Sequence, residues 1–259
     1  MGEIERIGDV LIAAERRRTA IGPVSELIPG GLDLELAHAI CERNIGLRLA
    51  AGDRIAGYKI GFTNIPARDS QGLPDSTYGY VLESTVLPGG AVLRMDEFIA
   101  PRIETEMCFR LGRDLSGDGL TVEQVLDATE AVCATFEICD ARIRDWKCPY
   151  PDFFADNSFS ARVVESGRWV PPSEVDVERE TVTLVRDGVT IAEGGAWNAM
   201  GHPAIAVAWL AAKLARRGKA IAKGQIVMTG SLTAVLPVSA GAKYAGEFAA
   251  LGRVEASFV

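Results

Sequence analysis

Apolar and polar positions along the chain follow two different periods, and the change between them divides the sequence. Residues 3–18 carry apolar side chains at helical spacing, and residues 33–51 repeat this pattern before Gly52 ends it. From Arg54 onward the apolar positions alternate or follow one another directly, which is typical of strands. The pattern therefore predicts a small helical region at the front of the chain, followed by a region made mostly of β-strands.

The second region also contains helical segments. Helices are expected near 121–133, where Thr121 is a good N-cap, and over 203–217, which begins with Pro203. The predicted strands are 55–62, 78–82, 102–111, 131–139, 181–186, 225–229, 234–238 and 252–259. Because the helices come first and do not alternate regularly with the strands, the order favours an α+β fold over a βαβ arrangement.

Three acidic residues interrupt apolar strand segments. Glu104 and Glu106 lie in the segment 103–107, and Glu137 lies in the segment 134–140. Side chains two residues apart on a strand share a face and lie roughly 7 Å apart, so Glu104 and Glu106 project the same way. Two half-buried like charges destabilise a fold unless a cation joins them, and Mg²⁺ and Mn²⁺ prefer oxygen ligands. The three acids therefore predict a site for one divalent cation.

A structural interpretation of the same acids is also open. Glu104 and Glu106 are compatible with the solvated face of an edge strand, where they would pair with Arg102 or Arg110. For an isolated Glu-X-Glu this is the more common situation. The third acid, on a second apolar segment, brings the two interpretations close to balance.

Composition narrows the classes of function. The chain has 259 residues, of which 48% are hydrophobic and 24% charged, as in an ordinary globular protein with one large domain or two unequal ones. Its formal net charge is −8 and it has no basic stripe, so nucleic acids and anionic membranes are poor partners. Five cysteines without a C-x-x-C pair and only two histidines argue against structural zinc. With no secretory signal or membrane span in the sequence, we expect a cytoplasmic protein with reduced thiols.

Six short segments follow one another along the second region. They are Gly57-Tyr58-Lys59-Ile60-Gly61-Phe62-Thr63, Pro101-Arg102-Ile103-Glu104-Thr105-Glu106, Phe136-Glu137-Ile138-Cys139-Asp140-Ala141-Arg142-Ile143-Arg144-Asp145-Trp146, Ala155-Asp156-Asn157-Ser158, Gly201-His202-Pro203 and Thr229-Gly230-Ser231-Leu232-Thr233. Together they resemble the 2-keto-4-pentenoate hydratase and 4-oxalocrotonate decarboxylase family, within the fumarylacetoacetate hydrolase superfamily. The similarity runs from about Ile55 to the C-terminus, and the helical front end is also similar to this family.

The resemblance implies a mixed β-sheet barrel or roll of the fumarylacetoacetate hydrolase C-terminal type, with a small N-terminal helical region, in a homo-oligomer. Residues 1–85 would hold the helical region and the first strands, and residues 86–259 the metal-binding core, unless the two form one continuous domain. It further implies Mg²⁺ or Mn²⁺ held by Glu104, Glu106 and Glu137, and a linear unsaturated 2-keto acid as substrate in the catabolism of aromatic compounds.

The chemistry of such a substrate agrees with a metal site. A 2-keto acid chelates a divalent ion through a carboxylate oxygen and the keto oxygen, and the ion stabilises the enolate that forms when a proton or CO₂ is moved. Lys59 lies in an apolar strand, where burial and the metal would lower its pKa and let it shuttle protons or hold the enolate oxygen. The alternative for Lys59 is a strand-end side chain that reaches solvent.

Other polar residues near these motifs have candidate roles. Asn157 can orient a ligated water or the substrate carboxylate, although a loop amide more often caps its own turn. Ser231 and Thr233 can bind the substrate carboxylate or satisfy the backbone of their turn. Asp140 and Arg142 are expected to form an ion network that supports the ligands.

One segment departs from the family pattern. Hydratases of the family carry a Pro-Asp-aromatic-Gly motif whose Asp is a proposed acid or base, and the corresponding stretch here is Leu73-Pro74-Asp75-Ser76-Thr77-Tyr78-Gly79. Thr77 occupies the Asp position and Asp75 is displaced by two residues. Threonine is not a general base near neutral pH. Either Asp75 reaches the site through a reshaped loop, or the reaction is a decarboxylation, which mainly needs an electron sink.

Three functions therefore stand at the level of sequence. The first is hydration of a 2-keto-4-enoate to a 4-hydroxy-2-keto acid, with Lys59 and Asp75 as catalytic residues. The second is decarboxylation of an oxalocrotonate-like diacid, favoured by the missing acid. The third is a non-catalytic subunit that associates with a sister hydratase or decarboxylase.

Overall fold

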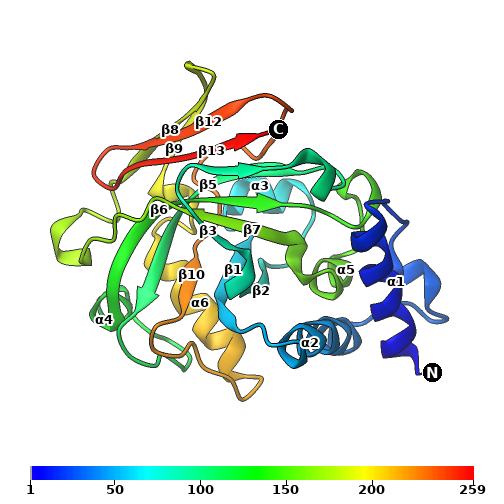
Figure 1. The fold of residues 1–259 in the computed structure, drawn as a ribbon. Coiled ribbons are helices and arrows are strands. Elements are labelled where there is room, and N and C mark those ends of the chain that lie inside the picture. The colour runs from blue at the N-terminus through cyan, green and yellow to red at the C-terminus, as the bar shows by residue number, and fades with distance from the viewer. Residues whose placement is uncertain (1) are drawn as a thin grey trace.

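The computed structural model describes residues 2–259, and its elements follow the predicted order of helices and then strands (Figure 1). The helices are α1 (Glu3–Arg17), α2 (Leu34–Ala50), α3 (Ile65–Ser70), α4 (Val122–Ala128), α5 (Tyr150–Ala155) and α6 (Pro203–Ala215). The strands are β1 (Ile55–Gly61), β2 (Thr77–Leu82), β3 (Val86–Pro88), β4 (Ala91–Leu93), β5 (Arg102–Leu111), β6 (Thr129–Cys139), β7 (Ser160–Glu165), β8 (Thr181–Arg186), β9 (Val189–Gly195), β10 (Ile226–Met228), β11 (Leu236–Pro237), β12 (Lys243–Phe248) and β13 (Gly252–Phe258). Within residues 2–259, none of the helices has the length and apolar character needed to cross a membrane.

Two mixed sheets make up the β part of the molecule. The larger sheet has eight strands, ordered β2-β1-β10-β5-β6-β7-β3, and β11 pairs with the beginning of β5. The smaller sheet, at the top of Figure 1, has the order β4-β13-β12-β8-β9. The larger sheet thus takes strands from both 1–85 and 86–259. Helices α1 and α2 lie beside it, close to the N-terminus in the figure.

The long pair β5 and β6 forms the centre of the fold. The two strands are antiparallel and paired from Arg102↔Cys139 to Leu111↔Thr129. Ile103, Met107 and Phe109 project from one face of β5 and are fully buried in the main apolar core. Because side chains alternate along a strand, the residues between them project to the opposite face. The acids of the sequence motif are on that opposite face.

The helix predicted over 121–133 is shorter than expected. Its N-terminus is confirmed, since Thr121 caps α4 in a capping box with Gln124. However, α4 ends at Ala128, and Thr129 already belongs to β6. Residues 129–133 contain two β-branched residues, Thr129 and Val132, and their backbone pairs with β5, which outweighs the helical spacing of the local sequence.

Candidate metal centre

The pairing of β5 with β6 brings the three acids of the sequence motif to one face. Glu104 lies directly opposite Glu137, and Glu106 lies opposite Thr135. Glu106 and Glu137 have no exposed surface, and Glu104 is 9% exposed. One carboxylate oxygen each from Glu104 and Glu137 lies within 4.8 Å of the other and of the Cys139 sulfur. The acids therefore form a buried cluster and do not mark a solvated edge.

The oxygens of this cluster lack the hydrogen bonds that buried carboxylates require. Both oxygens of Glu137 and Oε1 of Glu106 are buried without a hydrogen-bond partner among residues 2–259. The Oε2 atom of Glu106 accepts a hydrogen bond of 2.8 Å from the backbone N–H of Gly230. Unpaired buried acceptors are rare because their desolvation is not compensated. These orphaned oxygens fit a bound divalent cation.

The pKa shifts of the acids also favour a bound cation. Burial raises the pKa of Glu106 well above its usual range, and the neighbouring Glu137 and Glu104 raise it further. Burial also raises the pKa of Glu137 to about 7, although the cationic Lys59 acts in the opposite direction. Ionised carboxylates in this position repel one another, and a cation between them would relieve the repulsion.

Lys59, on β1, is the cation closest to the acids. Its side chain is buried, with Nζ 3.3 Å from Oε2 of Glu137 and donating a hydrogen bond of 3.0 Å to the carbonyl oxygen of Ser158. Burial opposes its charge, but Cys139 and the three acids outweigh burial and raise the pKa of Lys59. The expected decrease of this pKa depends on the charge of a bound metal as well as on burial, so it stays a prediction. The alternative of a lysine that reaches solvent is wrong, because Lys59 is buried.

A left-handed turn places Ser158 beside Lys59. Asn157, Ser158 and Phe159 have φ values of +50°, +48° and +61°, a region that residues other than glycine rarely occupy. The Oγ atom of Ser158 is 2.7 Å from Oγ1 of the buried Thr77. A methyl group at Gly61 would come within 3.6 Å of all three polar groups, Thr77 Oγ1, Ser158 Oγ and Lys59 Nζ. These groups therefore converge on one point next to the acids.

The amide of Asn157 holds this turn and does not point at the acids. Its Oδ1 accepts a hydrogen bond of 2.7 Å from the backbone N–H of Tyr80, and its Nδ2 donates one of 2.9 Å to the carbonyl of the same residue. The side chain thus pairs with β2 as a neighbouring strand would. This geometry agrees with the structural alternative for Asn157, and leaves it no free polar atom for a substrate.

Replacing Asn157 by glycine removes the side-chain amide but adds no backbone strain, since glycine adopts positive φ readily. The substitution should therefore weaken the turn only through the lost hydrogen bonds. We expect a loss of about 1–3 kcal/mol in the free energy of unfolding, because two partly buried hydrogen bonds to Tyr80 disappear. Urea denaturation measures this loss. An unchanged denaturation midpoint would show that the amide does not hold the turn.

The segment after β10 contacts the centre through its backbone. The Oγ of Ser231 donates to the carbonyl of Thr233 at 3.0 Å, and Oγ1 of Thr233 lies 2.9 Å from Oγ1 of Thr105. Thr105 projects to the face of β5 opposite the acids. Ser231 therefore bonds its own turn and Thr233 bonds β5 away from the acids, whereas the N–H of Gly230 reaches Glu106. Gly230 has φ +96°, and a Cβ atom there would lie 1.9 Å from Thr63 Oγ1, so only glycine fits.

Asp75 is not brought to the acid cluster. Its carboxylate lies 2.7 Å from Nζ of Lys213 and accepts a hydrogen bond of 3.1 Å from Nε1 of Trp209, both on α6. Thr77 occupies the buried position beside the Lys59 turn instead. The structure thus gives no sign of a loop that carries Asp75 inward.

Arg142 belongs to an ion network, but its main partner is Asp156. The guanidinium Nε bonds Oδ1 of Asp156, and Nη1 donates to the carbonyl of Asp140 at 2.7 Å. The carboxylate of Asp140 accepts hydrogen bonds from the backbone N–H groups of Ile99 and Ala100. The network therefore fixes Asp156, the residue just before the left-handed turn.

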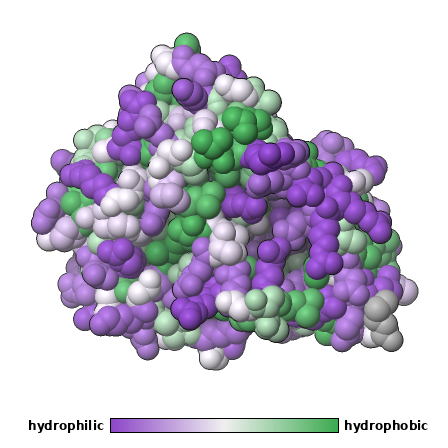
Figure 2. Space-filling model, in the orientation of Figure 1, coloured by the Kyte–Doolittle hydropathy of each residue, from purple (hydrophilic) through white to green (hydrophobic). Residues whose placement is uncertain are grey.

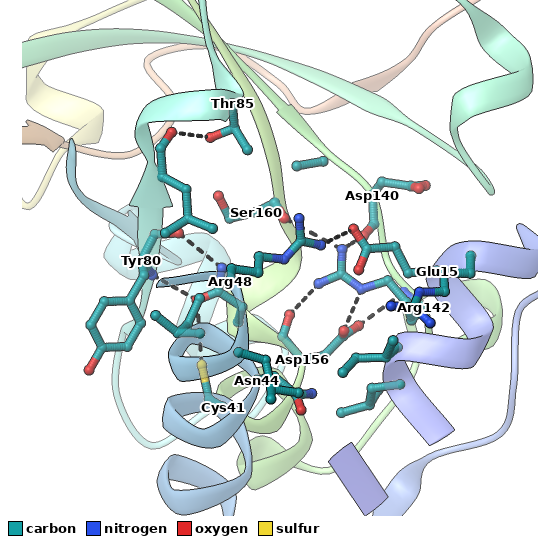
Figure 3. Close-up of a pocket in the computed structure, with 18 of the residues that line it drawn as sticks. Glu15, Cys41, Asn44, Arg48, Tyr80, Thr85, Asp140, Arg142, Asp156 and Ser160 are labelled. Atoms are coloured by element: carbon teal, nitrogen blue, oxygen red, sulfur yellow. Dashed lines mark hydrogen bonds and ion pairs between the residues drawn. The ribbon is translucent and has the colours of Figure 1, made fainter. Parts of the chain in front are cut away.

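The same network lines a cleft of about 610 Å³ between α1, α2 and the larger sheet. Figure 3 shows Arg142 between Asp156 and Glu15, with Arg48 reaching Glu15 from α2. Hydrophilic side chains dominate the surface over α1, whereas apolar side chains are also exposed along α2 (Figure 2). None of the three acids of the candidate centre lines this cleft, so it is separate from the centre.

Three groups at or near the centre were not predicted from the sequence. Cys139 shares a face with Glu137 because the two are two residues apart, and this parity could have revealed it. The N–H of Gly230 carries no side-chain signal. Asp156 lies in a recognised segment, but its partner Arg142 is 14 residues away and nothing in the spacing pairs them.

Comparison with known proteins agrees with these features. Residues 50–259 match the family model for the fumarylacetoacetate (FAA) hydrolase C-terminal region. The chain is 34% identical to 2-keto-4-pentenoate hydratase of Paraburkholderia phymatum, over 98% of this chain and 97% of that protein. It is 32% identical to 4-oxalocrotonate decarboxylase of Pseudomonas sp. strain CF600, over 81% of this chain and 80% of that protein.

A solved structure gives the same result for the fold. The 4-oxalocrotonate decarboxylase of Pseudomonas putida G7, complexed with magnesium and adipate, superposes with a TM-score of 0.93 at 29% identity, covering 100% of this chain and 99% of that one. The extent of both similarities confirms the predicted superfamily and mixed-sheet fold. The chain therefore belongs to the fumarylacetoacetate hydrolase family, in the group of 2-keto-4-pentenoate hydratases and 4-oxalocrotonate decarboxylases.

Proposed function

We propose that this protein is a divalent-metal-dependent lyase that hydrates a linear unsaturated 2-keto acid in the catabolism of aromatic compounds. The observation that carries the proposal is the buried cluster of Glu104, Glu106 and Glu137 with orphaned carboxylate oxygens beside Lys59. Relatives that are similar over 93–98% of this chain are named as hydratases of such acids. A family member with nearly the same fold is complexed with magnesium, and a more distant one with Mn²⁺.

Under this proposal the three glutamates hold Mg²⁺ or Mn²⁺. When bound, the cation supplies the positive charge that stabilises an enolate of the 2-keto acid. The N–H of Gly230 orients the carboxylate of Glu106. Lys59 holds a proton at Nζ and is fixed by the Ser158 carbonyl, so it can donate that proton to the substrate oxygen. Lys59 is only 2% exposed, and this burial keeps bulk water away from the proton.

Decarboxylation of an oxalocrotonate-like diacid is the second candidate. It is favoured by Thr77, which stands where family hydratases have an acid, and by the engagement of Asp75 with α6. A hydroxyl paired with Ser158 is no general base near neutral pH. Loss of CO₂ needs only an electron sink and a proton donor, which the cation and Lys59 would supply.

A coupled assay with purified protein and added Mg²⁺ separates the two reactions. Loss of the dienoate absorbance of a 2-hydroxy-2,4-dienoate without CO₂ release supports hydration. Release of bicarbonate from the unsaturated diacid supports decarboxylation. No turnover of either substrate, in protein that binds the metal, would contradict both and favour the non-catalytic subunit.

Glu106→Gln tests the metal assignment. The amide keeps the oxygen that accepts from Gly230 but removes the negative charge, so we expect Mn²⁺ affinity in calorimetry to fall at least 10- to 100-fold, roughly the loss known for supporting residues alone. Glu130→Gln, an exposed acid on the same β6 strand, is the matched control and should bind like the wild type. Equal Mn²⁺ binding by wild type and Glu106→Gln would remove Glu106 from the centre.

We further propose that the protein works in the cytoplasm as a homo-oligomer, with or without a sister hydratase or decarboxylase. Five cysteines, none of them in a disulfide, support a reducing compartment. Light scattering of the purified chain, alone and mixed with a sister enzyme, tests the assembly.

A further inference from the structure

The acid cluster contains a sulfur atom that the proposed reaction does not use. Cys139 is 2% exposed and projects to the same face of β6 as Glu137. Its Sγ lies 3.5 Å from Oε1 of Glu104 and 3.8 Å from Nζ of Lys59. Ligand atoms of Cys139, Glu104 and Glu137 all lie within 4.8 Å of one another. A cation that touches both carboxylates is therefore also within reach of the sulfur.

A second observation points to a ligand at this place. Glu137 is completely buried, and its oxygens have no hydrogen-bond partner among residues 2–259, although Nζ of Lys59 lies 3.3 Å from Oε2. A cluster that needed only an internal hydrogen bond from the thiol would leave fewer acceptors unsatisfied. The sulfur thus lies within 4.8 Å of a buried carboxylate whose oxygens lack hydrogen bonds.

The other two cysteines on this strand pair have different surroundings from Cys139. Cys108 and Cys133 lie opposite each other further along β5 and β6. Cys108 packs among aliphatic side chains, and Cys133 lies 3.1 Å from the hydroxyl of Ser166. Neither belongs to a group of three metal-binding side chains in the described part of the chain. Of these three cysteines, only Cys139 lies in such a group, with Glu104 and Glu137.

The chemistry of the donors decides which cations benefit. Carboxylates suit Mg²⁺, Ca²⁺ and Mn²⁺, whereas a thiolate selects softer ions such as Zn²⁺. We propose that Cys139 is a fourth protein ligand of the centre for transition-metal cations, so that the site holds Zn²⁺ or Co²⁺ more tightly than Mg²⁺. On binding, the thiol releases its proton to solvent and the sulfur coordinates as thiolate. With Mg²⁺ the sulfur remains a thiol that donates to Glu104. This inference rests on the proposed metal centre.

The test uses the metal-free full chain with Co²⁺ as a spectroscopic probe. A thiolate ligand gives cobalt an intense sulfur-to-metal charge-transfer band in the near ultraviolet, which oxygen ligands do not give. We expect this band in the wild type and in the control Cys133→Ser, and its loss in Cys139→Ser. Zn²⁺ affinity should fall at least 10- to 100-fold in Cys139→Ser, roughly the cost of losing a supporting residue of a metal site. Mg²⁺ affinity should stay unchanged.

Two further measurements distinguish a failure of the Cys139 assignment from a misfolded variant. Cys139→Val, an apolar replacement, should behave as Cys139→Ser does, and thermal melting shows whether either variant is folded. A wild type that binds Co²⁺ without the charge-transfer band, or a Cys139→Ser variant that keeps it, overturns the role of Cys139 while leaving the carboxylate centre intact. A wild type that binds none of Mg²⁺, Mn²⁺ and Co²⁺ overturns the metal centre itself.

Discussion

Replacing Lys59 by methionine is expected to lower kcat by roughly 100- to 10,000-fold, the usual contribution of a positioned proton donor. Methionine retains most of the apolar stem in the strand but removes the ammonium group beside Glu137 and the Ser158 carbonyl. Metal affinity should not fall, because the substitution removes a positive charge from the neighbourhood of the carboxylates. Steady-state kinetics and Mn²⁺ calorimetry on the same preparation measure the two effects.

The control for this substitution is Lys223→Met, on the exposed surface, which should keep wild-type turnover. A Lys59→Met enzyme with unchanged kcat would make Lys59 a bystander that only neutralises Glu137. A loss confined to KM would indicate that the ammonium group binds the substrate equally in the ground and transition states. Either result would leave the carboxylate centre in place but remove the proton donor from the mechanism.

The convergence of the acids could be predicted from the sequence because strand geometry alone determines part of it. Residues 104 and 106 must share a face of any regular strand. The sequence carries no comparable rule for register, so it could not tell which residue of β6 faces Glu104. The pairing of Glu104 with Glu137 depends on the whole length of the β5 and β6 ladder.

Polar residues in the loops were harder to interpret for a physical reason. A loop amide or hydroxyl can satisfy many partners, and the backbone decides which one is near. The amide of Asn157 bonds Tyr80, 77 residues away, because the turn has positive φ at three successive residues. The local sequence reveals neither the positive φ values of the turn nor the distant partner Tyr80. The same holds for Asp75, whose partners on α6 come close only in the folded chain.

Burial of the Arg142 pair links the N-terminal helices to the centre. Arg142 and Asp156 are 7% and 3% exposed, and Asp156 immediately precedes the turn that fixes Lys59. Burial raises the pKa of Asp156 to about 6, while Arg142 favours its charged form. The cleft in Figure 3 surrounds this pair with Glu15 and Arg48 from α1 and α2. A disturbance here is therefore transmitted to the backbone next to Lys59.

Arg142→Met should accordingly destabilise the fold by about 3–5 kcal/mol, because it leaves the carboxylate of Asp156 buried without its cation. The urea midpoint should fall while the dependence of the unfolding free energy on urea stays the same. Arg216→Ala is the matched control, since its pair with Asp118 is exposed and should contribute about 0–1 kcal/mol. If Arg142→Met costs no more than Arg216→Ala, the buried pair does not hold the turn, and the order around Lys59 must come from the Asn157 amide and the Thr77 hydroxyl alone.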